Sequence, residues 1–78
     1  MNMIVLYTND GQESERCRNL LLSLNGEFLE YQLDEDFTQV QFDREFGPGA
    51  EYPQVAIGTR HIGGLKETLH YLQDEGLI

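Results

Sequence analysis

Few side chains in the sequence could carry out nucleophilic or redox chemistry. Cys17 is the single cysteine, so the chain can form no internal disulfide, no CxxC redox pair and no cysteine-rich metal site. Ser14 carries a hydroxyl, but no histidine stands near it in an arrangement that would supply a general base. His61 and His70 belong to no cluster of Cys, His or Asp, which argues against a bound metal. A reaction at the Cys17 thiol is therefore the chemistry that most needs testing.

Cys17 itself is predicted to be a buried structural thiol. It recurs at helical spacing with Leu20, Leu21 and Leu24, which places it on the apolar face of a helix. Burial disfavours the thiolate, and the thiolate is the reactive form of a cysteine. Arginines flank Cys17 in the sequence, but neighbouring residues point to different sides of a helix. We therefore expect the Cys17 side chain to pack in the core. It remains the one candidate for a nucleophilic thiol.

The composition indicates one small folded domain spanning residues 1–78. The chain has 40% hydrophobic and 24% charged residues, which is typical of a globular protein. No apolar run approaches the ~20 residues needed to cross a bilayer. The N-terminus also lacks the basic flank and apolar run of a signal peptide. We therefore expect a cytoplasmic protein.

The charge balance limits the kinds of partner. Five basic residues against fourteen acidic ones give a net charge of −9. Such a charge repels phosphate backbones and anionic lipid surfaces. We therefore expect neither a nucleic acid nor a membrane as partner, whereas a protein or peptide with a basic face remains compatible.

The first part of the chain predicts a strand, a helix and a second strand. Residues 3–7 are apolar on both alternating faces, as in a central strand covered on both sides. Asp10 with Glu13 resembles a helix-start box, and the Asn-Gly pair at 25–26 supplies the stop. A half-buried strand is predicted from Phe28 onward. Its two faces consist of Leu29, Tyr31 and Leu33 on one side and Glu30 and Gln32 on the other.

The next segment predicts a helix with a clear beginning and end. Thr38 is suited to cap it, with Gln41 at the third helical position, and Phe37 is placed to pack against Phe42. Gly47, followed by a proline, ends the helix.

The last part predicts a hairpin and a final helix. Strands 54–57 and 60–62 are joined by the tight Gly58-Thr59 turn, which implies an antiparallel pair. A helix begins after Gly64 and buries a leucine stripe. The order is β-α-β-α-β-β-α, which predicts an α/β fold with a mixed four-stranded sheet flanked by helices.

Three motifs in this order resemble the glutaredoxin branch of the thioredoxin fold. They are Tyr7-Thr8 after the first strand, the Tyr-Pro-Gln-Val segment 52–55, and the His-Ile-Gly-Gly segment 61–64. The resemblance spans nearly the whole chain and is nearest to the short glutaredoxins of bacteriophages and some bacteria. It implies a thioredoxin-like α/β fold and a groove that accepts glutathione or an extended peptide.

The resemblance also implies the residues of that groove. Tyr52, preceding a cis Pro53, would offer its backbone N–H and C=O to a ligand, although a trans proline at a strand edge is the alternative. Gly63 and Gly64 would expose helix N-terminal amides to the carboxylate of the glutathione γ-glutamyl end, or would simply form a tight turn. Lys66 stands where the family commonly has an aspartate facing the amine of the ligand. Glutathione is therefore a possible ligand, but its amine would face an ammonium group instead of a carboxylate.

The catalytic loop of the family is where this chain departs furthest. Members place one or two cysteines in a four-residue motif that begins four residues after the position of Thr8. Here the motif consists of Gln12, Glu13, Ser14 and Glu15. None of these residues can exchange disulfides, and the two glutamates supply negative charge where a thiolate and anionic glutathione need positive potential. An iron–sulfur role would need the same missing cysteine.

These observations predict a redox-inactive, glutaredoxin-like protein that acts as a binding or structural module. Its predicted site is the groove of Tyr52, Pro53, Gly63 and Gly64, with no metal and no required cofactor. The alternative is an oxidoreductase or glutathione-binding protein that works through Cys17, or without a thiol through Ser14 or the helix N-terminus.

Overall fold

The computed structural model describes residues 3–24 and 27–78, which form four strands and three helices. Their bounds are β1 Ile4–Thr8, α1 Gln12–Ser23, β2 Phe28–Gln32, α2 Gln39–Phe46, β3 Gln54–Ile57, β4 Arg60–Gly63 and α3 Leu65–Asp74. The predicted element order is confirmed. Among the described residues, no helix is both long and apolar enough to span a bilayer.

The four strands form one mixed sheet in the order β2-β1-β3-β4. β1 pairs in parallel with β2, whereas β1 with β3 and β3 with β4 pair antiparallel. The parallel pair follows from the crossover through α1, and the last antiparallel pair follows from the two-residue turn. Gly58 in that turn has a φ of +61°, a conformation that glycine adopts without steric cost. The predicted mixed sheet is therefore confirmed.

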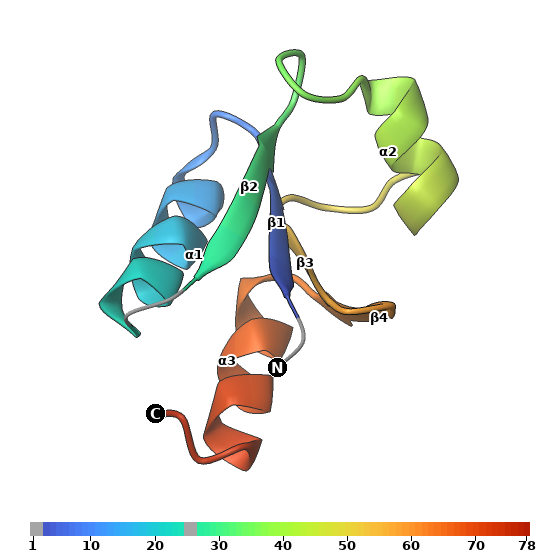
Figure 1. Ribbon diagram of the computed structural model, residues 1–78. Helices are drawn as coiled ribbons and strands as arrows, with labels where there is room; N and C mark the ends of the chain where they lie inside the picture. The colour runs from blue at the N-terminus through green and yellow to red at the C-terminus, as the bar shows by residue number, and fades with distance from the viewer. Residues whose placement is uncertain (1–2, 25–26) are drawn as a thin grey trace.

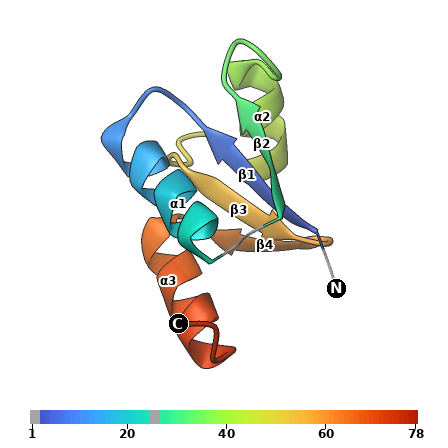
Figure 2. The same cartoon turned by 60° about the vertical axis from the view of Figure 1, so that its left-hand side comes forward.

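Helices cover the two faces of the sheet unequally. α1 and α3 lie on one face, and the shorter α2 lies on the other, near one end of the sheet (Figures 1 and 2). The core lies on the α1 and α3 face, where Leu6 and Val55 of the sheet meet Cys17 and Leu21 of α1. All four side chains are at most 1% exposed. This face therefore supplies most of the hydrophobic burial.

α1 does not begin as predicted. Its N-cap is Gly11, which has no capping side chain, so the box expected from Asp10 and Glu13 is wrong. Asn9 replaces it, because its Oδ1 accepts hydrogen bonds from the Gly11 N–H at 2.8 Å and from the Ser14 hydroxyl at 2.9 Å. The side chain two residues before the cap thus organises the turn. The predicted stop at 25–26 lies outside the described residues.

β1 is also less covered than expected. The expectation for residues 3–7 was burial on both faces, but the strand runs from Ile4 to Thr8 and Met3 is 56% exposed. The short α2 does not reach over this end of the sheet (Figure 1).

The apolar side of β2 is the more exposed one. Leu29 is 44% and Tyr31 is 37% exposed, so the expectation of a half-buried apolar face is only partly met. β2 is an edge strand, and these two residues share one face of it because side chains alternate along a strand. On the opposite face, the Glu30 carboxylate is held by Arg18 of α1.

The predicted cap of α2 is confirmed in every part. The Gln41 N–H donates to the Thr38 hydroxyl at 3.2 Å, and the Thr38 N–H donates to Gln41 Oε1 at 2.9 Å. The rings of Phe37 and Phe42 stack with centroids 5.8 Å apart. Gly47 ends the helix with a φ of +98°.

This reciprocal cap leads to a stability prediction. Thr38→Ala removes the acceptor of the Gln41 N–H and should lower the free energy of unfolding by about 1 kcal/mol, as measured by urea denaturation. Thr38→Ser retains the hydroxyl, so its free energy of unfolding should stay close to that of the parent. Equal stability of the alanine variant and the parent would contradict the role of the cap.

Candidate functional site

The loop between β1 and α1 leads into the first turn of α1, which exposes three of the four motif positions and buries the fourth. Gln12, Glu13 and Glu15 are exposed, whereas Ser14 is 1% exposed. The Ser14 hydroxyl donates to Asn9 Oδ1 at 2.9 Å and accepts from the Asn9 N–H at 3.1 Å. Both contacts tie the hydroxyl to the turn, so Ser14 has a structural role here and is not presented to a substrate.

The Cys17 thiol lies in the core and not in this loop. It is 0% exposed, and burial first, then the negative charge of Glu30, raises its pKa to about 11. The expected burial is confirmed. With that pKa, about one thiol in a thousand is ionised at pH 8.

Of the residues predicted to form the groove, Pro53 and Gly64 lie close to each other. The Tyr52–Pro53 peptide bond is cis, as predicted, and Pro53 is buried. A Cβ atom on Gly64 would lie 3.4 Å from the Pro53 carbonyl oxygen, so the two backbones are in close approach. The side chain of Tyr52 is held in place because its ring stacks on that of Phe42, with the ring centroids 4.1 Å apart.

The helix N-terminus beside this groove is partly occupied by the chain itself. Gly63 has a φ of +124°, and the carboxylate of Glu67 accepts a hydrogen bond from the Gly64 N–H at 2.9 Å. The prediction that this amide is exposed for a ligand carboxylate is therefore wrong for Gly64. An acidic residue at the third helical position is a common partner of the N-cap amide, and Glu67 carries that signal in the sequence.

Sequence reasoning missed a charged network where α1 faces β2. Arg18 donates to both carboxylate oxygens of Glu30, from Nε at 2.7 Å and from Nη2 at 2.5 Å. The buried Thr8 hydroxyl donates to the same carboxylate at 2.8 Å. These hydrogen bonds, that from Arg18 above all, lower the pKa of Glu30, although burial opposes the shift. The sequence shows Arg18 only as a neighbour of Cys17, because its partner lies on another element.

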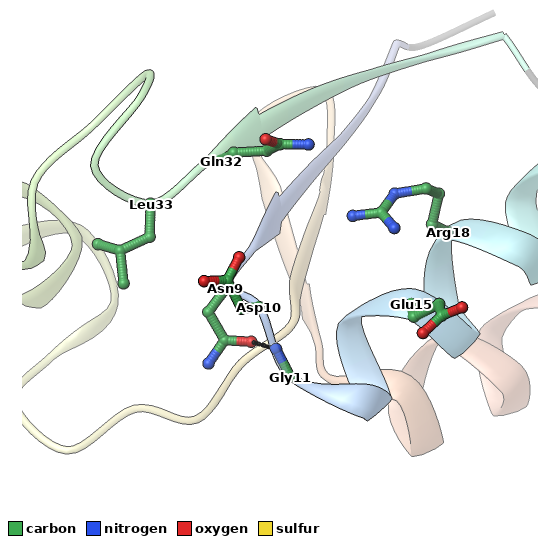
Figure 3. Close-up of a pocket in the computed structure, with 7 residues that line it drawn as sticks. All are labelled: Asn9, Asp10, Gly11, Glu15, Arg18, Gln32 and Leu33. Carbon is green, nitrogen blue, oxygen red and sulfur yellow. Dashed lines mark hydrogen bonds between the residues drawn. The ribbon is translucent and has the colours of Figure 1, made fainter.

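A pocket of about 190 Å³ lies beside this network (Figure 3). Its described lining consists of Asn9, Asp10, Gly11, Glu15, Arg18, Gln32 and Leu33. Arg18 is the one basic residue among them, and Glu30 already binds its guanidinium through two hydrogen bonds. With Asp10 and Glu15 also present, the pocket is a poor receptor for an anion.

Within residues 3–24 and 27–78, no three His, Cys, Asp or Glu side chains are grouped so that they could hold a metal ion. His61 instead contacts Glu45, with Nε2 and Oε1 2.9 Å apart.

The Arg18–Glu30 pair makes stability depend on pH. Because the folded pKa of Glu30 is lowered, its stabilising effect is present above the ordinary carboxyl pKa of about 4.3 and is lost as the pH falls through the folded value. Glu30→Gln should lower the free energy of unfolding by about 1–2 kcal/mol at neutral pH, with the difference from the parent shrinking near pH 3. Urea denaturation at both pH values measures this. Glu13→Gln, at an exposed position, is the matched control and should show neither effect.

Burial of the thiol predicts slow chemical modification. Iodoacetamide at pH 8 should alkylate Cys17 in the folded protein at least about a hundredfold more slowly than in the urea-unfolded chain, because burial limits both access and ionisation. Mass spectrometry over time gives both rates. Similar rates in the two states would contradict the burial of Cys17.

Comparisons with known proteins agree with this architecture. No protein-family model matches the chain, and no curated protein matches it. Among solved structures, a buckwheat glutaredoxin–glutathione complex superposes with a TM-score of 0.78 at 23% identity, covering 97% of this chain and 73% of that one. Glutaredoxin 1 from Francisella tularensis, complexed with cacodylate, has a TM-score of 0.72 at 22% identity, and the match covers 99% of this chain and 98% of that one.

A glutaredoxin from Brucella melitensis shares 29% identity with a TM-score of 0.70, covering 97% of this chain and 83% of its own. The resemblance predicted from the motifs is thus confirmed at the level of structure, in a chain whose single cysteine lies outside the motif. The chain therefore has the thioredoxin-like fold in the form found in glutaredoxins.

Proposed function

We propose that this protein is a redox-inactive, glutaredoxin-like module that binds an extended segment of a protein partner in the groove of Tyr52, Pro53, Gly63 and Gly64. The observation that carries the proposal is the contrast between the backbone at Pro53 and Gly64 and the position of the Cys17 thiol. The backbones of Pro53 and Gly64 lie close together, which supports a groove at these residues, whereas the thiol is buried in the core with a pKa of about 11.

The redox-inactive part of the proposal rests on the absence of an accessible thiol at the motif positions. Gln12, Glu13 and Glu15 have no thiol, and the Ser14 hydroxyl is bonded to Asn9 on both its donor and acceptor sides. Disulfide exchange needs an accessible thiolate that can attack a sulfur atom. In the folded chain the Cys17 thiol is not accessible, and its raised pKa keeps it mostly protonated.

Glutathione is a poor match for the groove. One of the structural neighbours is a complex with glutathione, but here the Glu67 carboxylate already accepts the Gly64 N–H. The exposed Glu13 and Glu15 would also repel an anionic ligand. Lys66, in place of an aspartate, removes a partner for the ligand amine.

The backbone of Tyr52 supports peptide binding. Its N–H and C=O make no hydrogen bond to any part of the described chain, although Tyr52 is held on Phe42 and its hydroxyl donates to Gln39 Oε1 at 3.1 Å. A fixed residue with unpaired main-chain groups can pair with an extended segment, as in strand addition. The net charge of −9 favours a partner with a basic surface.

The first test concerns redox activity. The protein should show no reduction of a mixed disulfide between glutathione and 2-mercaptoethanol above the uncatalysed rate, and Cys17→Ser should be indistinguishable from the parent. Turnover that is lost in the serine variant would refute redox inactivity, and an established glutaredoxin serves as positive control.

The second test concerns the groove. Peptides selected from a random displayed library on the parent protein should lose about tenfold or more in affinity for Gly64→Ala, because the added methyl would lie 3.3 Å from Glu67 Oε1 and 3.4 Å from the Pro53 oxygen. Gly64 has a φ of −86°, so alanine fits the backbone. Gln73→Ala on the exposed side of α3 is the control and should bind normally. Selected peptides that bind both variants equally would place binding elsewhere.

Glutathione provides a matched comparison for the same groove. In an NMR titration at millimolar concentration, it should leave the amide signals of Tyr52 and Gly64 unmoved. Saturable shifts at those two amides would favour the glutathione-binding alternative.

A further inference from the structure

A separate pocket of about 360 Å³ lies on the sheet face that carries α2. It is bounded by α2, by the strands β1 and β2 and by the loop that joins β2 to α2. Its described aromatic lining consists of Tyr7, Tyr31, Phe37, Phe42 and Phe46. None of these residues belongs to the groove of the proposed function, so the inference below does not depend on that groove.

The rings meet at steep angles around Tyr7. The Tyr7 centroid lies 5.5 Å from that of Tyr31, 5.5 Å from Phe37 and 5.0 Å from Phe46. The corresponding interplanar angles are 51°, 72° and 69°. Rings at such angles form walls of different orientation around a concave space, and their faces carry the negative part of the ring quadrupole.

The remaining lining residues are Asp36, Gln41 and Glu45, two of which are acidic. Asp36 and Glu45 line the pocket, and no Lys or Arg is among its described lining residues. Asp36 accepts the Gln32 N–H through Oδ2 at 2.9 Å, and Glu45 contacts His61 through Oε1 at 2.9 Å. The second oxygen of each carboxylate makes no hydrogen bond within residues 3–24 and 27–78. Each is therefore available as an acceptor for a ligand.

The charge of Glu45 acts inside the pocket. The pKa of Tyr7 is raised, by burial first and then by the negative charge of Glu45. The loop beside the pocket also carries Asp34 and Glu35 next to Asp36. The potential in this region is therefore negative, which repels an anion and attracts a cation.

We propose that this pocket binds the side chain of an arginine from a protein partner. A guanidinium group is planar and weakly hydrated, so it can stack on a tyrosine or phenylalanine face while its N–H groups donate to Asp36 and Glu45. A quaternary ammonium has no N–H to donate to the carboxylates, and a lysine ammonium is more strongly hydrated. The combination of aromatic walls and free carboxylate oxygens therefore selects guanidinium.

The pocket is next to the groove without being part of it. The Tyr52 ring stacks on Phe42 at 4.1 Å and on Phe37 at 6.3 Å, so aromatic packing joins the two regions. One partner segment could therefore occupy the groove and place an arginine in the pocket.

The first experiment uses four matched tripeptides, N-acetylated and C-amidated, with glycine on both sides of arginine, citrulline, lysine or trimethyl-lysine. The probe is the aromatic ¹H–¹³C spectrum of the full chain. The arginine peptide should give saturable shifts at Tyr7, Tyr31 and Phe46, and the citrulline peptide should bind about tenfold or more weakly, because it keeps the shape and loses the charge. Equal binding of citrulline would overturn the proposal, as would tighter binding of lysine or trimethyl-lysine.

The second experiment tests the carboxylates. Asp36→Asn and Glu45→Gln should each weaken binding of the arginine peptide at least about threefold, and Glu75→Gln, which removes the same charge beyond the end of α3, should leave it unchanged. Both pocket substitutions are at exposed positions, and the amide spectrum of each variant verifies that it is folded. Unchanged affinity in both pocket variants would overturn the proposal.

The location of the shifts separates this proposal from the groove. Arginine-dependent shifts confined to the amides of Tyr52 and Gly64 would overturn the pocket and leave the groove standing. Conversely, shifts at the pocket rings that persist in Gly64→Ala would support the pocket even if that variant binds every selected peptide normally.

Discussion

The packing of α1 against the sheet is the constraint on which the remaining structure depends. Leu6 and Val55 from neighbouring strands meet Leu21 and Cys17 from the helix, and all four are removed from water. A chain of 78 residues has room for only one such core, so few of its apolar side chains can be spared. Cys17 is therefore a packing residue, and the pKa of about 11 follows from this use of its side chain.

The same packing positions the first turn of α1, where the four motif residues lie. Fixing α1 on the sheet places its N-terminus beside the end of β1, where Asn9 and Ser14 bond to each other. The outward positions of this turn are Gln12, Glu13 and Glu15, which are polar or acidic. The scaffold that positions a thiolate in glutaredoxins therefore presents negative charge here.

Aromatic residues organise the opposite face. Phe42 is the buried residue of α2 and contacts Phe37, Phe46 and Tyr52 through its ring. α2 makes aromatic contact with the sheet through Phe46 and Tyr7 of β1, whose ring centroids lie 5.0 Å apart. The same packing holds Tyr52 at the groove and forms walls of the pocket, so both candidate binding regions depend on it.

Features that depend on neighbours in the chain could be predicted from the sequence alone. The Thr38 and Gln41 cap, the contact of Phe37 with Phe42, the Gly58 turn and the order of elements each follow from short-range hydrogen bonding or periodicity. The burial of Cys17 was predictable for the same reason, since the apolar face of a helix repeats within one segment. The glutaredoxin-type fold followed from the order together with the three motifs.

The pairing of polar groups across the fold and the exposure of certain apolar side chains depend on how the elements pack against one another. The binding of Arg18 to Glu30 joins two elements, and Leu29 stays exposed on β2, which lies at the edge of the sheet. The aromatic pocket likewise gathers residues from two strands, a loop and a helix. Spacing along one segment cannot reveal these contacts, because they depend on how the elements meet across the sheet.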